Sequence, residues 1–211
     1  MFRLESVNLG RPKTIVLGTR SVETGIDKQP VERAFVGRLG LSGDTIADEM
    51  HHGGPDQAVY LYSRADYAWW EAELGVPLAP GTFGENLTVS GLGEEPRPGD
   101  RLRIGGAVLE LTAPRVPCAV FADRMGERAW VKRFRAAGRP GAYARVLEEG
   151  EVEAGDAVEL IPTDEPHPSL RDLFRLYYDR KAPADELRRA LAAPIAERER
   201  HELEERLAQL A

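Results

Sequence analysis

The chain has 211 residues, with 28 Lys and Arg against 35 Asp and Glu, a formal charge of −7, and one cysteine, Cys118. A single cysteine excludes an intramolecular disulfide and a multi-cysteine zinc or iron–sulfur site, which fits a reducing compartment. The acidic balance argues against a nucleic-acid polymer as the main partner, because phosphate binding needs clustered Lys and Arg. No apolar run approaches the roughly 18 residues of a membrane span, and the N-terminus has no signal-peptide core, so we expect a cytoplasmic protein without a membrane partner.

Residues 1–162 alternate short apolar runs with turns rich in Gly and Pro, which is typical of β-structure. Strands are predicted at 4–9, 14–17, 58–62, 86–89, 101–104, 108–112, 143–147 and 157–161. Many short strands with Gly-rich corners indicate a barrel or a sandwich. Two helices are predicted within this region, 63–74 with Ser63 as its N-cap, and 125–137.

The last part of the chain has a different composition. Glycine is absent from 165–211, and Ala, Leu, Arg and Glu dominate. Proline fits the first turn of a helix and breaks its interior, so Pro183 and Pro194 predict three helices, near 169–180, 184–192 and 195–208. We therefore divide the chain into a β-domain, 1–164, and a helical domain, 165–211. The mixed charges of the helical domain favour a packing or dimerisation role over a helix-turn-helix DNA reader, which would need a basic face.

Cys118 follows an apolar strand in the segment Pro-Arg-Val-Pro-Cys at 114–118. Pro117 cannot donate to a strand ladder, so we expect the thiol at a strand end or barrel rim. A guanidinium three residues upstream, on Arg115, favours the thiolate, which attacks electrophiles and binds soft metals. The alternative is a buried, inert cysteine.

A second candidate cluster, 43–57, combines His51 and His52 with acidic residues and a Gly-Gly pair. Adjacent histidines on an extended chain point to opposite sides, and the i, i+4 spacing of helical zinc ligands is missing, so a zinc or iron site is weakly supported. Gly53 and Gly54 fit better with close approach of the backbone to an anionic ligand.

Three further segments carry polar groups that belong either to a site or to the scaffold. In 81–88, two glycines flank Phe83, and Glu85 and Asn86 either face a site or satisfy loop backbone. Tyr143 and Arg145 share one face of a strand, where they either line a pocket or pair with surface acids. Lys28 is of interest only if the fold brings it to Cys118.

In chain order, these segments read Ile-x-Lys-x-Pro-Val at 26–31, His-Gly-Gly-x-Asp-x-Ala-Val at 52–59, Gly-x-Phe-Gly-Glu-Asn-Leu-Thr at 81–88, Pro-Arg-x-Pro-Cys at 114–118 and Gly-x-Tyr-x-Arg-Val at 141–146. Together they resemble the MOSC family, named for the C-terminal domain of molybdenum cofactor sulfurases, and within it the bacterial YiiM type, which also ends in three helices. The sequence departs from the family pattern after Asp44 and at Ala142, where a bulky aromatic is common.

The resemblance implies a mainly β fold, a MOSC-type barrel with helical inserts followed by a small three-helix domain, and a molybdenum–molybdopterin cofactor. It also implies reduction of small N-hydroxylated compounds of the 6-hydroxylaminopurine type, with electrons from a separate reductase, since no Gly-x-Gly-x-x-Gly fingerprint is present. Family-level pyridoxal phosphate binding, a detoxification role and a homodimer are further expectations.

By the same resemblance, Cys118 is the metal ligand and converges with Arg115 and Lys28, while His52 is the expected proton donor because imidazole titrates near neutrality. The expected cofactor-binding residues are Gly53, Gly54, Asp56, Phe83, Gly84, Glu85, Asn86, Arg115, Tyr143 and Arg145.

Two alternative functions are also compatible with the sequence. In one, the protein is a non-redox carrier, in which Cys118 holds a persulfide or the cofactor for delivery. In the other, the helical tail defines a regulator and the barrel is only a scaffold.

Overall fold

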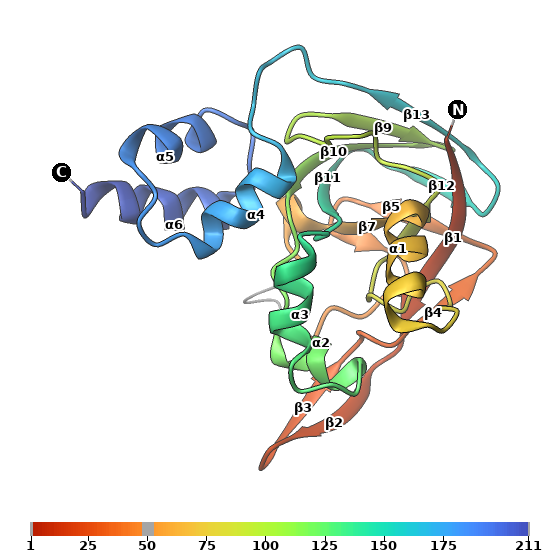
Figure 1. The fold of residues 1–211 in the computed structure, drawn as a ribbon. Helices are drawn as coiled ribbons and strands as arrows, with labels where there is room; N and C mark the ends of the chain where they lie inside the picture. Colours follow the sequence, from red (N-terminus) through yellow and green to blue (C-terminus); the bar gives the residue numbers. More distant parts are fainter. Residues whose placement is uncertain (1, 48–52, 211) are drawn as a thin grey trace.

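The computed structural model describes residues 2–47 and 53–210 (Figure 1). Its strands are β1 Phe2–Gly10, β2 Lys13–Leu17, β3 Arg20–Thr24, β4 Lys28–Val31, β5 Arg33–Gly37, β6 Gly40–Leu41, β7 Val59–Ser63, β8 Leu87–Val89, β9 Arg101–Ile104, β10 Ala107–Ala113, β11 Ala142–Glu148, β12 Gly150–Glu153 and β13 Ala157–Ile161. Its helices are the 3₁₀ turn η1 Pro55–Gln57, α1 Arg64–Leu74, α2 Ala119–Arg124, α3 Trp130–Ala137, α4 Leu170–Tyr178, α5 Ala184–Leu191 and α6 Glu197–Ala208.

Within the described residues, seven strands close into a barrel in the order β13, β9, β10, β11, β7, β8, β1. The closing pair is antiparallel, with Phe2 opposite Val158, and only β7 and β8 run parallel among the barrel pairs. β9 alternates exposed and buried residues, whereas β7 and β10 are buried throughout because both of their faces are covered. The predicted fold class, a mainly β barrel with helices, is confirmed.

The strands outside the barrel are short. β4 extends the sheet beside β1, and its Pro30 is tolerated because β4 is an edge strand. β12, β5 and β6 form a small second sheet, and β2 and β3 form a hairpin that projects from the molecule on the side of α2 (Figure 1). The segment after this hairpin packs backbone against backbone, because a Cβ on Gly25 would lie 2.1 Å from the carbonyl oxygen of Thr45.

Helices α1, α2 and α3 contribute to a cluster of buried aromatic side chains, which we call the aromatic cluster. Its aromatic members are Tyr60, Tyr62, Tyr67, Trp70, Phe83, Phe121, Trp130, Phe134, Tyr143 and Phe174. Ser63 caps α1 by accepting a hydrogen bond from the amide of Asp66, as its position in the sequence predicted. Trp70 of α1 packs against Trp130 and Phe134 of α3, with ring centroids 4.8 and 6.0 Å apart. The single helix predicted at 125–137 is wrong at its start: α3 begins at Trp130, and α2 precedes it, separated by a turn in which Gly126 has a φ of 66°.

The C-terminal helices lie together beside one end of the barrel (Figure 1). A capping box between Ser169 and Asp172 starts α4, and Pro183 precedes the first residue of α5. Their buried leucines, including Leu173 and Leu203, belong to the same apolar core as the barrel interior. Among the helices of the described part of the chain, none combines the length and apolar character needed to cross a membrane.

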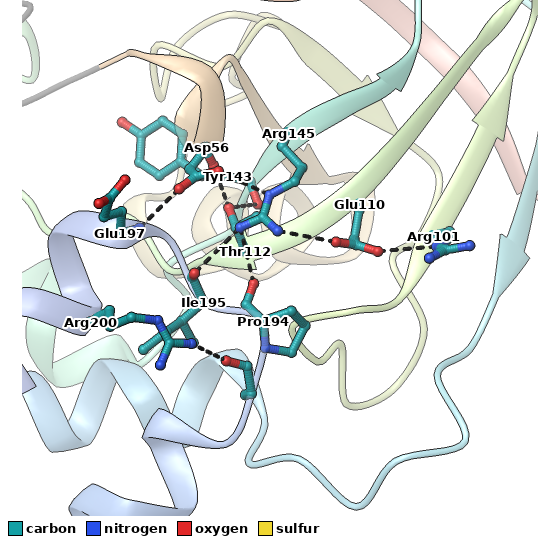
Figure 2. Close-up of polar contacts among 11 residues, drawn as sticks. Asp56, Arg101, Glu110, Thr112, Tyr143, Arg145, Pro194, Ile195, Glu197 and Arg200 are labelled. Atoms are coloured by element: carbon teal, nitrogen blue, oxygen red, sulfur yellow. Dashed lines mark hydrogen bonds and ion pairs between the residues drawn. The ribbon is translucent and has the colours of Figure 1, made fainter.

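Arg145 of β11 connects the barrel to the start of α6 (Figure 2). Its Nε lies 3.0 Å from Oδ1 of Asp56, and its Nη2 donates to the carbonyl oxygens of Pro194 and Ile195, each at 3.3 Å. Oδ2 of Asp56 accepts a hydrogen bond from the amide of Glu197 at 2.9 Å. We call this set the barrel–helix network, and it fixes α6 against the barrel.

Candidate active site

A cavity of about 620 Å³ opens where the barrel, the β2–β3 hairpin and the C-terminal helices meet. Its wall is built from distant parts of the sequence: residues 22–26, Lys28, residues 44–47, Gly53, Gln57, Ala58, Tyr60, Gly84, Asn86, residues 114–120, Tyr143, and the helix residues Tyr177, Arg198, Glu199 and Glu202. Of the residues that sequence analysis singled out, Cys118, Arg115, Lys28, Gly53, Gly84, Asn86 and Tyr143 line this cavity. The volume is sufficient for a small-molecule ligand.

Cys118 is presented to the cavity by the turn between β10 and α2. β10 ends at Ala113, the two prolines of 114–118 hold the backbone extended, and Cys118 becomes the N-cap residue of α2. The side chain is partly exposed rather than buried, and it is a free thiol. The cysteine therefore lies beyond a strand end, as Pro117 predicted, and is accessible to a ligand in the cavity.

Arg115 is buried beneath the same turn. Its Nη1 donates to the carbonyl oxygen of Phe83 at 2.9 Å, and its guanidinium lies over the rings of Tyr60 and Phe121, 4.8 and 4.6 Å from their centroids. Burial opposes the charge, but Tyr143, Tyr60 and the Cys118 thiol together raise the pKa of the guanidinium. Arg115 is thus a permanent cation next to the cysteine, and its Nε has no hydrogen-bond partner among the described residues.

Lys28 is buried and paired. Its Nζ donates to both carboxylate oxygens of Asp44, which also accepts from the amide of Gly10 at 2.6 Å and from Nδ2 of Asn86 at 2.8 Å. Burial lowers the pKa of the Lys28 ammonium, and the charge of Asp44 opposes that effect. Asp44 therefore fixes the position of the Lys28 amino group and opposes the effect of burial on its pKa, a role that sequence analysis did not assign.

Glu85 lies beneath the cavity and does not line it. Its Oε1 accepts from the Tyr67 hydroxyl at 2.6 Å, the Gly81 amide at 2.7 Å and the Thr88 hydroxyl at 2.6 Å. Burial raises the pKa of Glu85, against the effect of these three donors. This agrees with the interpretation that Glu85 satisfies loop backbone. Asn86 differs, because it lines the cavity and also accepts from the Tyr60 amide through Oδ1 at 3.1 Å.

Four other expected cofactor-binding residues do not reach the cavity surface. Arg145 and Asp56 are engaged in the barrel–helix network (Figure 2). Phe83 is fully buried in the aromatic cluster, and Gly54 is exposed before η1. Arg145 and Asp56 are turned away from the cavity for the same reason. Residues at the start of α6 provide carbonyl and amide groups that bind both side chains, and these partners are not part of the sequence motifs. His52 lies outside the described residues, and those residues contain no group of three metal-ligating side chains.

The sequence analysis missed the contribution of α6. Glu199 accepts a hydrogen bond from Nε2 of Gln57 at 2.8 Å, and Arg198 donates to Oε1 of the same glutamine at 2.7 Å. Burial raises the pKa of Glu199 to about 7. The only sequence signal was the polarity of Gln57 within a glycine-rich motif, and its partners are about 140 residues away along the chain.

The comparisons with known proteins agree with this architecture. The family model described as MOSC domain matches residues 48–159, and the model described as YiiM-like, 3-alpha helix domain matches residues 168–210. The chain belongs to the MOSC domain family.

The chain is similar to several known proteins, including the following three. An uncharacterized Bacillus subtilis protein, YflK, is 41% identical over 83% of this chain and 81% of its own length. The crystal structure of YiiM from Geobacillus stearothermophilus is 30% identical, with a TM-score of 0.81 over 98% of this chain and all of that one. A Gibberella moniliformis protein described as "Reductase" is 30% identical over 92% of this chain, which spans only 35% of that longer protein.

Proposed function

We propose that this protein is a molybdenum cofactor-dependent reductase that converts N-hydroxylated compounds of the 6-hydroxylaminopurine type into the corresponding amines. The observation that carries the proposal is the partly exposed Cys118 thiol in a 620 Å³ cavity beside the buried cation Arg115, in a chain of the MOSC family. The name of the Gibberella relative supports redox chemistry over a purely structural role.

The residues of the cavity fit a molybdenum–pterin group. A thiolate is a soft ligand that suits molybdenum, so Cys118 is the proposed metal ligand. The unpartnered Nε of Arg115 leaves a donor for an anionic group. A Cβ on Gly84 would lie 3.2 Å from Nη1 of Arg115, so the glycine keeps the approach to this cation open. Arg115, Asn86, Tyr143 and Gly53 are the residues proposed to hold the pterin.

Reduction of R–NH–OH to R–NH₂ breaks the N–O bond, consumes two electrons and two protons, and releases water. The cofactor, when bound, would supply the redox chemistry, with electrons from a separate reductase. Arg115 would hold the thiolate and stabilise negative charge on the departing oxygen. Lys28 would act as a fixed ammonium oriented by Asp44. His52 remains the proposed proton donor. Pyridoxal phosphate is not part of the proposal, because the Lys28 ammonium is already committed to Asp44.

The second candidate is a carrier that holds a persulfide or the cofactor on Cys118. The partial exposure of the thiol favours it as much as it favours the reductase.

Activity assays with cysteine variants test the proposal. The wild-type protein, purified from a host that makes the molybdenum cofactor, should reduce 6-hydroxylaminopurine when supplied with an artificial electron donor. We expect Cys118→Ala and Cys118→Ser to fall to background, while Glu204→Gln, on the exposed face of α6, keeps wild-type activity. Turnover by Cys118→Ala would refute the role of the thiol. A persulfide adduct on Cys118 without any turnover would favour the carrier.

A further inference from the structure

The cavity is electrostatically two-sided. Its barrel side carries Arg115 and the neutralised pair of Lys28 and Asp44. Its helix side carries the carboxyls of Glu199 and Glu202 on α6, together with Arg198, which donates to Oε1 of Gln57. Pro114 and Val116, from the segment that presents Cys118, also line a small recess together with Glu199 and Glu202, so this segment faces α6.

Tyr143 lines the same cavity. Burial chiefly raises the pKa of its hydroxyl, and the charges of Arg115, of Cys118 and of Glu199 and Arg198 on α6 also act on it. A ligand that is bound at Cys118 and extends past Tyr143 would therefore reach α6. The end of the ligand remote from the reacting group is the part that α6 can recognise.

Glu199 is held in one orientation. Arg198 can only donate hydrogen bonds, so it fixes Oε1 of Gln57, and Nε2 of Gln57 must then point to Glu199. This contact occupies Oε1 of Glu199. Its other oxygen, Oε2, is buried and accepts no hydrogen bond from any described residue. When Glu199 is ionised, a buried carboxyl oxygen without a donor is costly, and because Glu199 lines the cavity, an N–H group from a bound ligand would satisfy it.

We propose that Glu199 is a specificity-determining residue that accepts a hydrogen bond from a ring N–H of a nitrogen base whose N-hydroxyl group lies toward Cys118. This inference rests on the proposed function for the substrate and its direction, and it adds which feature of the base is recognised, namely a second donor remote from the reacting group. Glu202 has a partner in Arg180 at 2.9 Å and is the secondary member of the same wall.

Glu199→Gln tests the proposal with little change in shape. The amide oxygen of the new side chain must face Nε2 of Gln57, which places its NH₂ group at the position of Oε2. The variant therefore presents a donor where the wild-type protein presents an acceptor. Glu199→Ala removes the group altogether, and Glu204→Gln on the exposed face of the same helix is the matched control.

The measurement is equilibrium binding by calorimetry at pH 8, where Glu199 with its pKa of about 7 is mostly ionised, without any electron donor, to protein isolated with its cofactor. The probes are 6-hydroxylaminopurine, which has a ring N–H, and benzamidoxime, whose remote end is a bare phenyl ring. We expect Glu199→Gln and Glu199→Ala to weaken binding of 6-hydroxylaminopurine by about tenfold, as for the loss of one hydrogen bond to a charged group, and to leave benzamidoxime unaffected. Glu204→Gln should bind both probes as the wild-type protein does.

Equal weakening for both probes, or none for either, would overturn the proposal. The outcome is separable from that of the proposed function. If the wild-type protein reduces neither compound but Glu199→Gln still loses 6-hydroxylaminopurine selectively, the reductase assignment fails and the recognition by Glu199 stands. If the wild-type protein reduces 6-hydroxylaminopurine and Glu199→Gln binds it normally, the recognition fails and the reductase assignment stands.

Discussion

Lys28 and Arg115 carry the same charge but act differently in the cavity. Lys28 is neutralised by Asp44, which donors from two other segments hold in place. Arg115 makes no ion pair with a carboxylate of the described residues, and its charge is supported by aromatic rings and by the neighbouring thiol. Arg115 is therefore the residue with charge to offer an anionic ligand, and Lys28 is held chiefly by Asp44.

The raised pKa of Glu199 gives a pH-dependent stability that can be measured. The pKa is about 7 in the folded protein against 4.5 for the unperturbed group, so folding favours the protonated carboxyl. Its stabilising contribution is complete below pH 4.5 and is lost as the pH rises through 7. Glu199→Gln stays neutral throughout. Its free energy of unfolding relative to wild type should rise by on the order of 3 kcal/mol between pH 4.5 and pH 8.

Urea unfolding of both proteins at the two pH values gives this difference. Arg198 and Glu202 on α6, Gln57 on η1 and Tyr143 on β11 surround the group and are common to both proteins. The exposed control Glu204→Gln should show no such change. An advantage of Glu199→Gln that is the same at both pH values would mean that the carboxyl titrates as it does in the unfolded chain.

At the scale of elements, the barrel–helix network joins β11 to the start of α6. Replacing Arg145 by Met removes an ion pair to Asp56 and contacts to two carbonyls, and it leaves these acceptors partly buried. We expect a loss of about 2–3 kcal/mol in the free energy of unfolding, with faster hydrogen exchange in α6 than in the barrel strands. Arg188→Met, which removes an exposed pair with Asp185, is the control and should leave both measurements unchanged. Uniform exchange across the molecule would show that the network does not fix α6 specifically.

Local patterns predicted most of the elements, because the barrel strands and the C-terminal helices have their own apolar periods and breakers. The ranges 101–104 and 157–161 match β9 and β13 at both ends. The strands β3, β4, β5, β6 and β12 were missed, since they are short and their composition carries little signal. β4 and β12 in addition pair with strands remote in sequence, β1 and β5. The division at residues 164 and 165 stays a prediction, and the shared apolar core shows that the helices pack directly on the barrel.

The candidate site was predictable where a motif presents its residue directly to the cavity, as for Cys118 and Arg115. It was not predictable where contacts between segments remote in sequence determine whether a side chain reaches the cavity. Other motifs contain Arg145 and Asp56, which are bound in the barrel–helix network by contacts with α6. Asp44, from the cluster 43–57, is paired with Lys28. Glu199 carried no local signal, because its place in the cavity depends on how α6 docks on the barrel.

For the whole molecule, the barrel provides the thiol, Arg115 and Lys28, and α6 adds Arg198 and the carboxyls of Glu199 and Glu202. This arrangement reconciles a chain charge of −7 with an anionic cofactor, because a few cations, Arg115 among them, line the cavity in which that cofactor would bind. In the function proposed above, Cys118 holds a molybdenum–pterin group in this cavity.

The most direct test is the molybdenum and pterin content of the wild-type protein and of Cys118→Ser, both purified from a host that makes the cofactor. We expect near-equimolar molybdenum in the wild-type protein and a loss of most of it in Cys118→Ser, with both proteins equally folded by circular dichroism. Equal molybdenum in the two proteins, or none in the wild-type protein, would contradict the proposed role of Cys118.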